Sequence, residues 1–335
     1  MKLGKTNLTV NKNGFGALPI QRRNTADSVE ILRYAYDNGI NFFDSARYYT
    51  DSEDKIGEAF EDVRENIYLA SKTQAEEVEE FHKDLETSLK SMKTDYIDLY
   101  QFHNISFCPK KEDELYQAML EAKNEGKIKH IGITTHKITI AHEAIKSRLY
   151  ETLQYPFSYL SREKEISLVK ECKKTNIGFI AMKAMGGGLI TNSKASYAYI
   201  NQFDNVLPIW GIQKLEELKE FLSYDENTVL TQELKNIIEK DKRELKEEFC
   251  RGCGYCMPCP QKINISMCAR MSLWIRRFPS EPYLTEEYQN MMNKTGKCTQ
   301  CQTCISKCPY ELNIPRLLKE NYHDYMNILN NTEVK

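Results

Sequence analysis

Long apolar segments are missing from this sequence. No window approaches the ~20 apolar residues that a membrane-spanning helix needs, and the start, MKLGKTNLTVNKNGFGALP, lacks the apolar stretch of a secretory signal. An excess of one charge is missing too, because 46 Lys and Arg face 48 Asp and Glu, for a formal net charge of −2. This balance argues against nucleic acid or an anionic membrane as a partner. We therefore expect a cytoplasmic protein that binds neither.

A reducing cytoplasm disfavours disulfides, so the 11 cysteines need another explanation. Eight of them lie in two runs, CRGCGYCMPCP (250–260) and CTQCQTCISKCP (298–309). For Cys108, Cys172 and Cys268, which stand alone, we expect ordinary buried thiols. With 335 residues, 41% hydrophobic and 28% charged, the chain can form one large domain and a small one.

A glycine-rich loop after the first strand, typical of a doubly wound sheet, is also missing; PIQRRNTADS follows instead. Strand-like segments alternate with helical periodicity up to about residue 225. The strand-like segments are residues 14–18, 40–44, 66–72, 96–103, 128–134, 151–155, 177–183 and 205–210. Alternating strands and helices indicate a parallel sheet. Eight such units predict an α/β fold with a closed (β/α)8 TIM barrel.

The sequence predicts three parts. Residues 1–225 form the barrel, and the N-terminal MKLGKTNLTVNKNG supplies a two-stranded hairpin that covers the barrel floor. Residues 226–249 read as one charged amphipathic linking helix. Residues 250–335 form a small, mainly helical iron–sulfur domain that closes with a C-terminal helix.

Four polar residues fall at or just beyond the ends of three successive strand segments: Asp44, Tyr49, Lys72 and His103. The carboxyl ends of barrel strands carry the chemistry, and successive strands are neighbours, so these side chains can converge. A lysine ammonium lowers the pKa of a nearby phenol, an aspartate keeps the lysine charged, and a histidine can donate a hydrogen bond to a carbonyl oxygen. Such a group suits a general acid that turns a carbonyl into an alcohol. Singly, each would more often be an ordinary cap, surface charge or polar residue.

Three stretches carry a family resemblance that covers residues 1 to about 225. FFDSARYYTDSE resembles the strand-2 motif of the aldo-keto reductases, SLKSMKTDYIDLYQFH resembles their approach to the strand-4 histidine, and GKIKHIGIT resembles their strand 5. The resemblance implies a catalytic tetrad in which Tyr49 protonates the carbonyl oxygen. Lys72 and Asp44 would tune Tyr49, and His103 would orient a small carbonyl substrate.

The same resemblance implies a dinucleotide, NADP(H) or NAD(H), across the strand ends. The residues at the corresponding positions are Thr134, Gln154, Met182, Lys183, Gly186, Gly187, Gly211 and Lys214. Met182 stands where the family commonly has a stacking aromatic, and Glu217 falls near the usual place of a phosphate-binding arginine. Because glutamate repels a 2′-phosphate, we expect little preference for NADPH. The glycines could let backbone amides approach a phosphate, or simply form a flexible loop.

The second cysteine run has the spacing of a bacterial ferredoxin loop, with Cys298, Cys301 and Cys304 three apart and Cys308 before a proline. The first run, Cys250, Cys253, Cys256 and Cys259, is one residue short in its last gap. The spacing predicts two [4Fe–4S] clusters, each with three thiols from one run and the last cysteine of the other. Structural zinc is the alternative, but eight thiols in two runs that each end in Cys-Pro favour cubanes.

The combination resembles the ferredoxin-tailed branch of the aldo-keto reductases. A cluster passes single electrons, whereas nicotinamide donates a hydride, and no residue pattern visibly bridges the two. Three hypotheses about the role of the clusters stay open. The clusters are structural, a flavin or other mediator occupies the barrel, or the substrate accepts electrons singly. The leading function is carbonyl reduction. The alternative is an electron-transfer protein, served by a ferredoxin or flavoprotein partner, whose barrel no longer uses nicotinamide.

Overall fold

The structure, a computed structural model, describes residues 1–225, 227–245 and 248–333. It contains two compact units, one formed by Met1–Ala184 with Asn192–Thr231 and the other by Met185–Thr191 with Gln232–Lys335. The predicted boundaries at residues 225 and 249 stay predictions. The first unit reaches Thr231, and Met185–Thr191, which the sequence placed in the barrel, belongs to the second unit.

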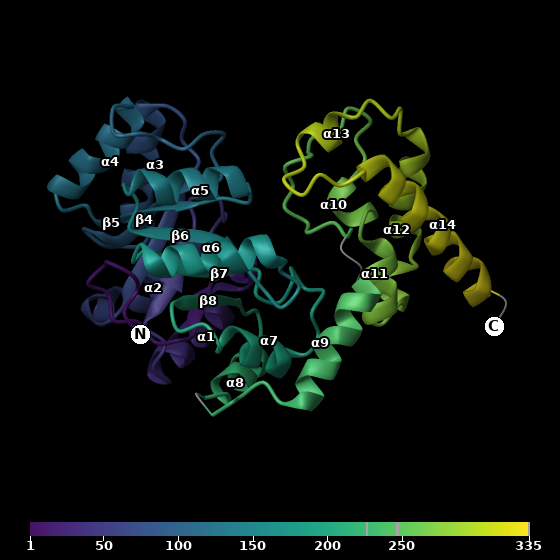
Figure 1. The fold of residues 1–335 in the computed structure, drawn as a ribbon, viewed down its shortest axis with the longest axis horizontal. Coiled ribbons are helices and arrows are strands. Elements are labelled where there is room, and N and C mark those ends of the chain that lie inside the picture. The colour runs from purple at the N-terminus through teal and green to yellow at the C-terminus, as the bar shows by residue number, and fades with distance from the viewer. Residues whose placement is uncertain (226, 246–247, 334–335) are drawn as a thin grey trace. The chain divides into compact units, whose positions relative to one another are not determined.

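The first unit is a closed barrel of eight parallel strands in chain order (Figure 1). The strands are β1 (Gly14–Gly16), β2 (Phe42–Asp44), β3 (Tyr68–Thr73), β4 (Ile97–His103), β5 (Ile128–Thr134), β6 (Thr152–Pro156), β7 (Gly178–Met182) and β8 (Val206–Gly211). Each strand falls on one of the eight predicted segments, so the barrel prediction is confirmed. The strands lie inside a ring of helices, which explains their continuous apolar runs.

Eight helices alternate with these strands. They are α1 (Thr25–Asp37), α2 (Ser52–Phe60), α3 (Val78–Ser91), α4 (Glu114–Asn124), α5 (Ile138–Ser147), α6 (Glu163–Lys174), α7 (Ser193–Ile200) and α8 (Leu215–Leu222). Short 3-10 turns are η1 (Leu18–Ile20) and η2 (Glu61–Asn66). Helix α1 shows why the ends fall where they do: the Asn24 side chain accepts from the Asp27 amide at 3.2 Å, and Gly39 follows with φ of 88°.

The N-terminal segment closes the barrel floor, although its hairpin is shorter than predicted. Only one antiparallel bridge forms, between Lys2 and Thr9. Leu3 is fully buried and packs in the same apolar cluster as Phe42. Gly4 has φ of 57°, and a Cβ there would lie 2.1 Å from the Gly178 amide nitrogen at the start of β7. This close approach curls the segment against the barrel and leaves little length for strand pairing.

The second unit is helical, and its described residues contain no strand. Its helices are α9 (Gln232–Leu245), α10 (Ile265–Cys268), α11 (Met271–Arg277), α12 (Glu286–Asn293), α13 (Thr303–Ser306) and α14 (Ile314–Glu333), with 3-10 turns η3 (Glu281–Tyr283) and η4 (Lys294–Lys297). Helix α14 contains the predicted closing helix. The core of the second unit includes the fully buried side chains of Ile263, Cys268, Met271, Met292 and Tyr325.

The cysteines outside the two runs are buried, as expected for ordinary core thiols. Cys108 and Cys172 lie in the first unit, and Cys268 lies in the core of the second. In the part of the chain that the structure describes, no helix has both the length and the apolarity to span a bilayer.

Candidate active site and metal centres

The barrel brings the predicted tetrad residues to one end of three adjacent strands. Asp44 ends β2, Lys72 lies one residue before the end of β3, and His103 ends β4. Register pairs Asp44 with Ala70 and Lys72 with Gln101, so from β2 to β4 each tetrad position lies two residues further along its strand than the partner of the preceding one. The chain order therefore becomes a spatial cluster, as the barrel predicts.

Lys72 and Asp44 form a buried ion pair. The Lys72 Nζ lies 2.7 Å from Asp44 Oδ2, with the two side chains 0% and 2% exposed. Nζ also donates to the Ser45 carbonyl. Burial raises the pKa of Asp44 and lowers the pKa of Lys72, while each partner opposes the shift of the other. Each charge of this pair therefore has its partner within the protein itself.

Tyr49 lies against this pair, but its acidity differs from the sequence-based expectation. Lys72 Nζ lies 5.2 Å from the Tyr49 ring centroid. Burial and then the charge of Asp44 raise the pKa of Tyr49, whereas Lys72 was expected to lower it. The main cause is burial, which disfavours the charged phenolate, and the nearby Asp44 carboxylate adds to it. Tyr49 is therefore a phenol at neutral pH, which still suits a proton donor.

His103 completes the cluster as a neutral imidazole. Its ring lies 5.8 Å from the Tyr49 ring, between centroids, at an interplanar angle of 83°. Burial and the charge of Lys72 lower the pKa of His103 to about 3. Its Nδ1 is buried and has no hydrogen-bond partner among the described residues. The histidine thus has unused hydrogen-bonding capacity beside Tyr49.

A buried carboxylate that sequence reasoning missed holds the loop of Tyr49. Glu53 is 1% exposed, binds Arg47, and accepts from the hydroxyls of Ser71 at 2.5 Å and Ser88 at 2.8 Å. The Tyr49 amide donates to the Ala46 carbonyl at 2.9 Å. Arg47 and Glu53 stand in the motif FFDSARYYTDSE, so the signal was present beside the tyrosine.

A second histidine at this end of the barrel was also passed over. His136 follows β5 and is 4% exposed. Burial lowers its pKa well below the usual range, and the charge of Lys183 acts in the same direction. The sequence did place His136 just past the end of a predicted strand, which is where barrel sites form.

Three residues expected on the nucleotide side gather at the ends of β5 to β7. Register pairs Thr134 with Gln154, and the Thr134 Oγ1 lies 4.0 Å from Met182 Sδ. Gln154 Oε1 accepts from Gln101 Nε2 at 2.9 Å. Lys183 follows Met182 with φ of 57°, an uncommon conformation for a residue with a side chain.

The other expected nucleotide contacts are arranged differently. Gly211 ends β8, but Glu217 binds the amides of Gln213 at 2.9 Å and of Lys214 at 3.2 Å and so caps α8. These amides are engaged by the protein itself. Gly186 and Gly187 belong to the second unit, where the Gly187 carbonyl accepts from Arg270 Nη2 at 3.5 Å.

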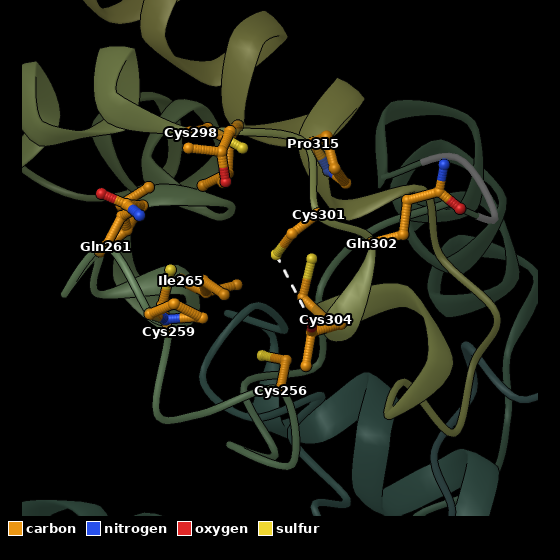
Figure 2. Close-up of a pocket in the computed structure, with 14 residues that line it drawn as sticks. Cys256, Cys259, Gln261, Ile265, Cys298, Cys301, Gln302, Cys304 and Pro315 are labelled. Atoms are coloured by element: carbon orange, nitrogen blue, oxygen red, sulfur yellow. Dashed lines mark hydrogen bonds between the residues drawn. The ribbon is translucent and has the colours of Figure 1, made fainter.

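The eight clustered thiols form two sets, each drawn from both runs. We define the first sulfur site as Cys250, Cys253, Cys256 and Cys308, whose thiols act on one another electrostatically. We define the second sulfur site as Cys259, Cys298, Cys301 and Cys304, which line one cavity with Cys256 at its edge (Figure 2). The last cysteine of each run thus joins the thiols of the other run.

The sulfur sites fit a multi-atom cluster better than a single ion. None of the eight cysteines forms a disulfide, and the cavity of the second site holds about 390 Å³ of empty space, part of it open to solvent. In residues 1–225, 227–245 and 248–333, no group of three or more His, Cys, Asp or Glu side chains is placed to hold one metal ion.

Comparison with known families settles the membership of the chain. Residues 12–247 match the Aldo/keto reductase family, and residues 249–313 match a 4Fe-4S dicluster domain. The chain belongs to the aldo-keto reductase family. It is an oxidoreductase of that family with a C-terminal 4Fe-4S dicluster domain, and the resemblance inferred from its motifs is confirmed.

Individual aldo-keto reductases match the barrel region. The "Probable aldo-keto reductase 1" of Glycine max is 27% identical over 56% of this chain and 60% of its own length. "Aldo-keto reductase YhdN" of Bacillus subtilis is 32% identical over 58% of this chain and 63% of its own length. The solved structure of the aldo-keto reductase AKR11C1 from Bacillus halodurans (holo form) has a TM-score of 0.64 at 23% identity, covering 72% of this chain and 95% of that one. This last likeness supports the fold.

Proposed function

We propose that the barrel reduces a small carbonyl compound to an alcohol with NADPH or NADH. The observation that carries this proposal is the convergence of Tyr49, His103 and the Lys72–Asp44 pair, with 2.7 Å between Lys72 Nζ and Asp44 Oδ2. Asp44, Lys72 and His103 are buried and Tyr49 is partly buried beside them, an arrangement that four unrelated surface residues would not share. An aldo-keto reductase with this tetrad has the groups that carbonyl reduction needs.

The roles follow from the contacts. Nicotinamide, when bound, supplies the hydride for the carbonyl carbon. Tyr49 keeps its proton because burial and Asp44 raise its pKa, and it gives that proton to the carbonyl oxygen as charge develops there. Neutral His103 donates a hydrogen bond to the same oxygen. The Lys72 ammonium, held by Asp44, stabilises the phenolate that the transfer leaves.

We further propose that each sulfur site holds one [4Fe–4S] cluster through its four thiolates. The three closely spaced thiols of one run and the last thiol of the other supply four ligands per cluster. Such clusters carry single electrons. A ferredoxin or flavoprotein is the class of partner suited to exchange electrons with them.

A second candidate function is supported by the nucleotide side. Glu217 already engages the amides of Gln213 and Lys214, and the Gly187 carbonyl is bound by Arg270. The contacts of Glu217 occupy two amide donors that could otherwise anchor a dinucleotide phosphate, and Gly187 belongs to the second unit. The alternative is an electron-transfer protein, with a flavin or no cofactor in the barrel.

One variant separates the two candidates. Tyr49→Phe removes only a hydroxyl, so about eight iron and eight sulfide per chain should remain. If Tyr49 is the proton donor, turnover of carbonyl substrates should fall by about 10²–10⁴-fold, while re-oxidation of the clusters by an external acceptor stays unchanged. The matched control is Tyr48→Phe, because Tyr48 adjoins Tyr49 but is 52% exposed. Full carbonyl activity in Tyr49→Phe would contradict the proposed reduction.

A further inference from the structure

One arginine is buried in the second unit without a carboxylate. Arg270 is 7% exposed, and it precedes α11 as the N-cap residue. No acidic side chain pairs with it in the part of the chain that the structure describes, and its Nε has no hydrogen-bond partner there. A buried charge is costly unless another group compensates it, so this guanidinium needs a counter-charge.

The guanidinium is held in one place. Its central carbon lies 4.6 Å from the centroid of the Trp274 ring, and Nη2 donates to the Gly187 carbonyl at 3.5 Å. Neither partner carries a charge. The two contacts fix the position of the positive charge without neutralising it.

That position adjoins the first sulfur site. A Cβ on Gly252 would lie 2.1 Å from Arg270 Nη1, so only glycine leaves room for the guanidinium. Gly252 has φ of 60°, and its amide donates to Cys250 Sγ at 3.4 Å. The loop between Cys250 and Cys253 is thus shaped so that a cation can approach it.

Among the residues that the structure describes, the second sulfur site has no buried cation recorded beside it. Of its thiols Cys301 is exposed and the other three are partly buried; in the first sulfur site Cys250 and Cys256 are 6% and 8% exposed. Exposed lysines flank the second run, but water and salt screen their charges. A buried cation therefore distinguishes the first site from the second.

We propose that Arg270 raises the reduction potential of the cluster in the first sulfur site. This inference depends on the proposed clusters. Reduction adds one electron, and hence one negative charge, without breaking a bond; the electron comes from a one-electron donor, dithionite in the experiment or a redox protein in the cell. Burial makes the added charge costly, and an adjacent buried guanidinium offsets this cost. Arg270 is a positioning residue for charge and touches no substrate.

The test is an anaerobic redox titration followed by electron paramagnetic resonance. Arg270→Met should lower one of the two midpoints by at least tenfold in the reduction equilibrium, about 59 mV for one electron, and leave the other unchanged. Arg276→Met is the matched control, because Arg276 lies on the adjoining helix, pairs with Asp324 and has a side chain 58% exposed. It removes the same charge and should shift neither midpoint by that amount.

Iron and sulfide counts separate the possible failures. A wild-type protein without about eight iron would contradict the proposed clusters. Full iron with unchanged midpoints in Arg270→Met, or an equal shift in Arg276→Met, would overturn the role of Arg270. If Arg270→Met loses iron, Arg270→Lys decides: it keeps the charge, so it should keep its iron and both midpoints within tenfold of wild type. Loss of iron in Arg270→Lys too would overturn the proposal.

Discussion

The barrel and the second unit organise their reactive groups by different means. In the barrel, Lys72 binds Asp44 at 2.7 Å and Glu53 binds Arg47, so protein groups hold one another in position. In the second unit, eight thiols from two loops line two sites and form no disulfide. The comparison teaches that the barrel site is preorganised by the fold, whereas the sulfur sites depend on what they bind.

Removal of the clusters should give the largest contrast between the two units. Metal binding to thiolates couples to folding, because the loops lose their common ligand when the metal leaves. After anaerobic oxidation and chelation, we expect residues 249–313 to become fully sensitive to protease while the barrel stays protected. Mass spectrometry of the fragments measures this. Equal protection before and after iron loss would show that the apolar core around Met271 and Tyr325 suffices.

Lys72→Met tests the preorganised side of the comparison. It should lower carbonyl turnover by about 10²–10⁴-fold and, because the Asp44 charge stays buried without its partner, destabilise the barrel by roughly 3–5 kcal/mol. Turnover and the thermal midpoint of unfolding measure the two effects.

A double variant separates these effects. Asp44→Asn with Lys72→Met removes both charges, so the barrel should regain much of its stability while remaining inactive. Recovery of turnover in the double variant would contradict a direct role for the lysine in proton transfer.

The pH dependence of stability should report His103. Its pKa falls from 6.5 to about 3 on folding, so the unfolded chain binds the proton first as the pH drops. The contribution of neutral His103 to the free energy of unfolding is therefore complete above pH 6.5. It is lost between pH 6.5 and 3, at about 1.4 kcal/mol per pH unit. His103→Gln should show a shallower fall of the barrel's thermal midpoint between pH 7 and 5. Identical slopes would mean that the folded histidine titrates normally.

The smallest expected effect concerns the nucleotide. Glu217→Gln keeps an oxygen that can cap α8 but removes a negative charge, so binding of NADPH should improve a few-fold relative to NADH. Glu216→Gln, on the same helix, is the matched control and should change the ratio little. Competition titrations with both dinucleotides measure the ratio of the NADPH and NADH affinities. Unaltered ratios in both variants would place the 2′-phosphate away from this helix.

Regular periodicity made most of the fold predictable. Each barrel strand carries its own apolar run, and the turn residues near α1 and α4 mark their ends. The tetrad was predictable for the same reason, because successive strand ends must be neighbours. The short N-terminal hairpin was not, since the contact that curls it, between Gly4 and Gly178, joins residues far apart in sequence.

Three expectations from the sequence differ from the structure because they depend on contacts that residue types do not reveal. Glu217 appeared to face a phosphate, but it turns back on Gln213 and Lys214. Gly187 looked like a phosphate contact, but its carbonyl accepts from Arg270 in the second unit. Lys72 was expected to lower the pKa of Tyr49, but burial, and after it the charge of Asp44, raise that pKa. Residue types alone do not specify these pairings.

The exchange of the last cysteine between the two runs bears on how the protein is made. On the proposed ligand sets, the first sulfur site needs Cys308 and the second needs Cys259, so a chain that ends before the second run would complete neither. Three thiols of the first run leave the ribosome well before their fourth partner exists. On the proposed ligand sets, iron loading of either site must then wait for the second run, and products truncated before that run would carry free, oxidisable cysteines instead of a partly working module.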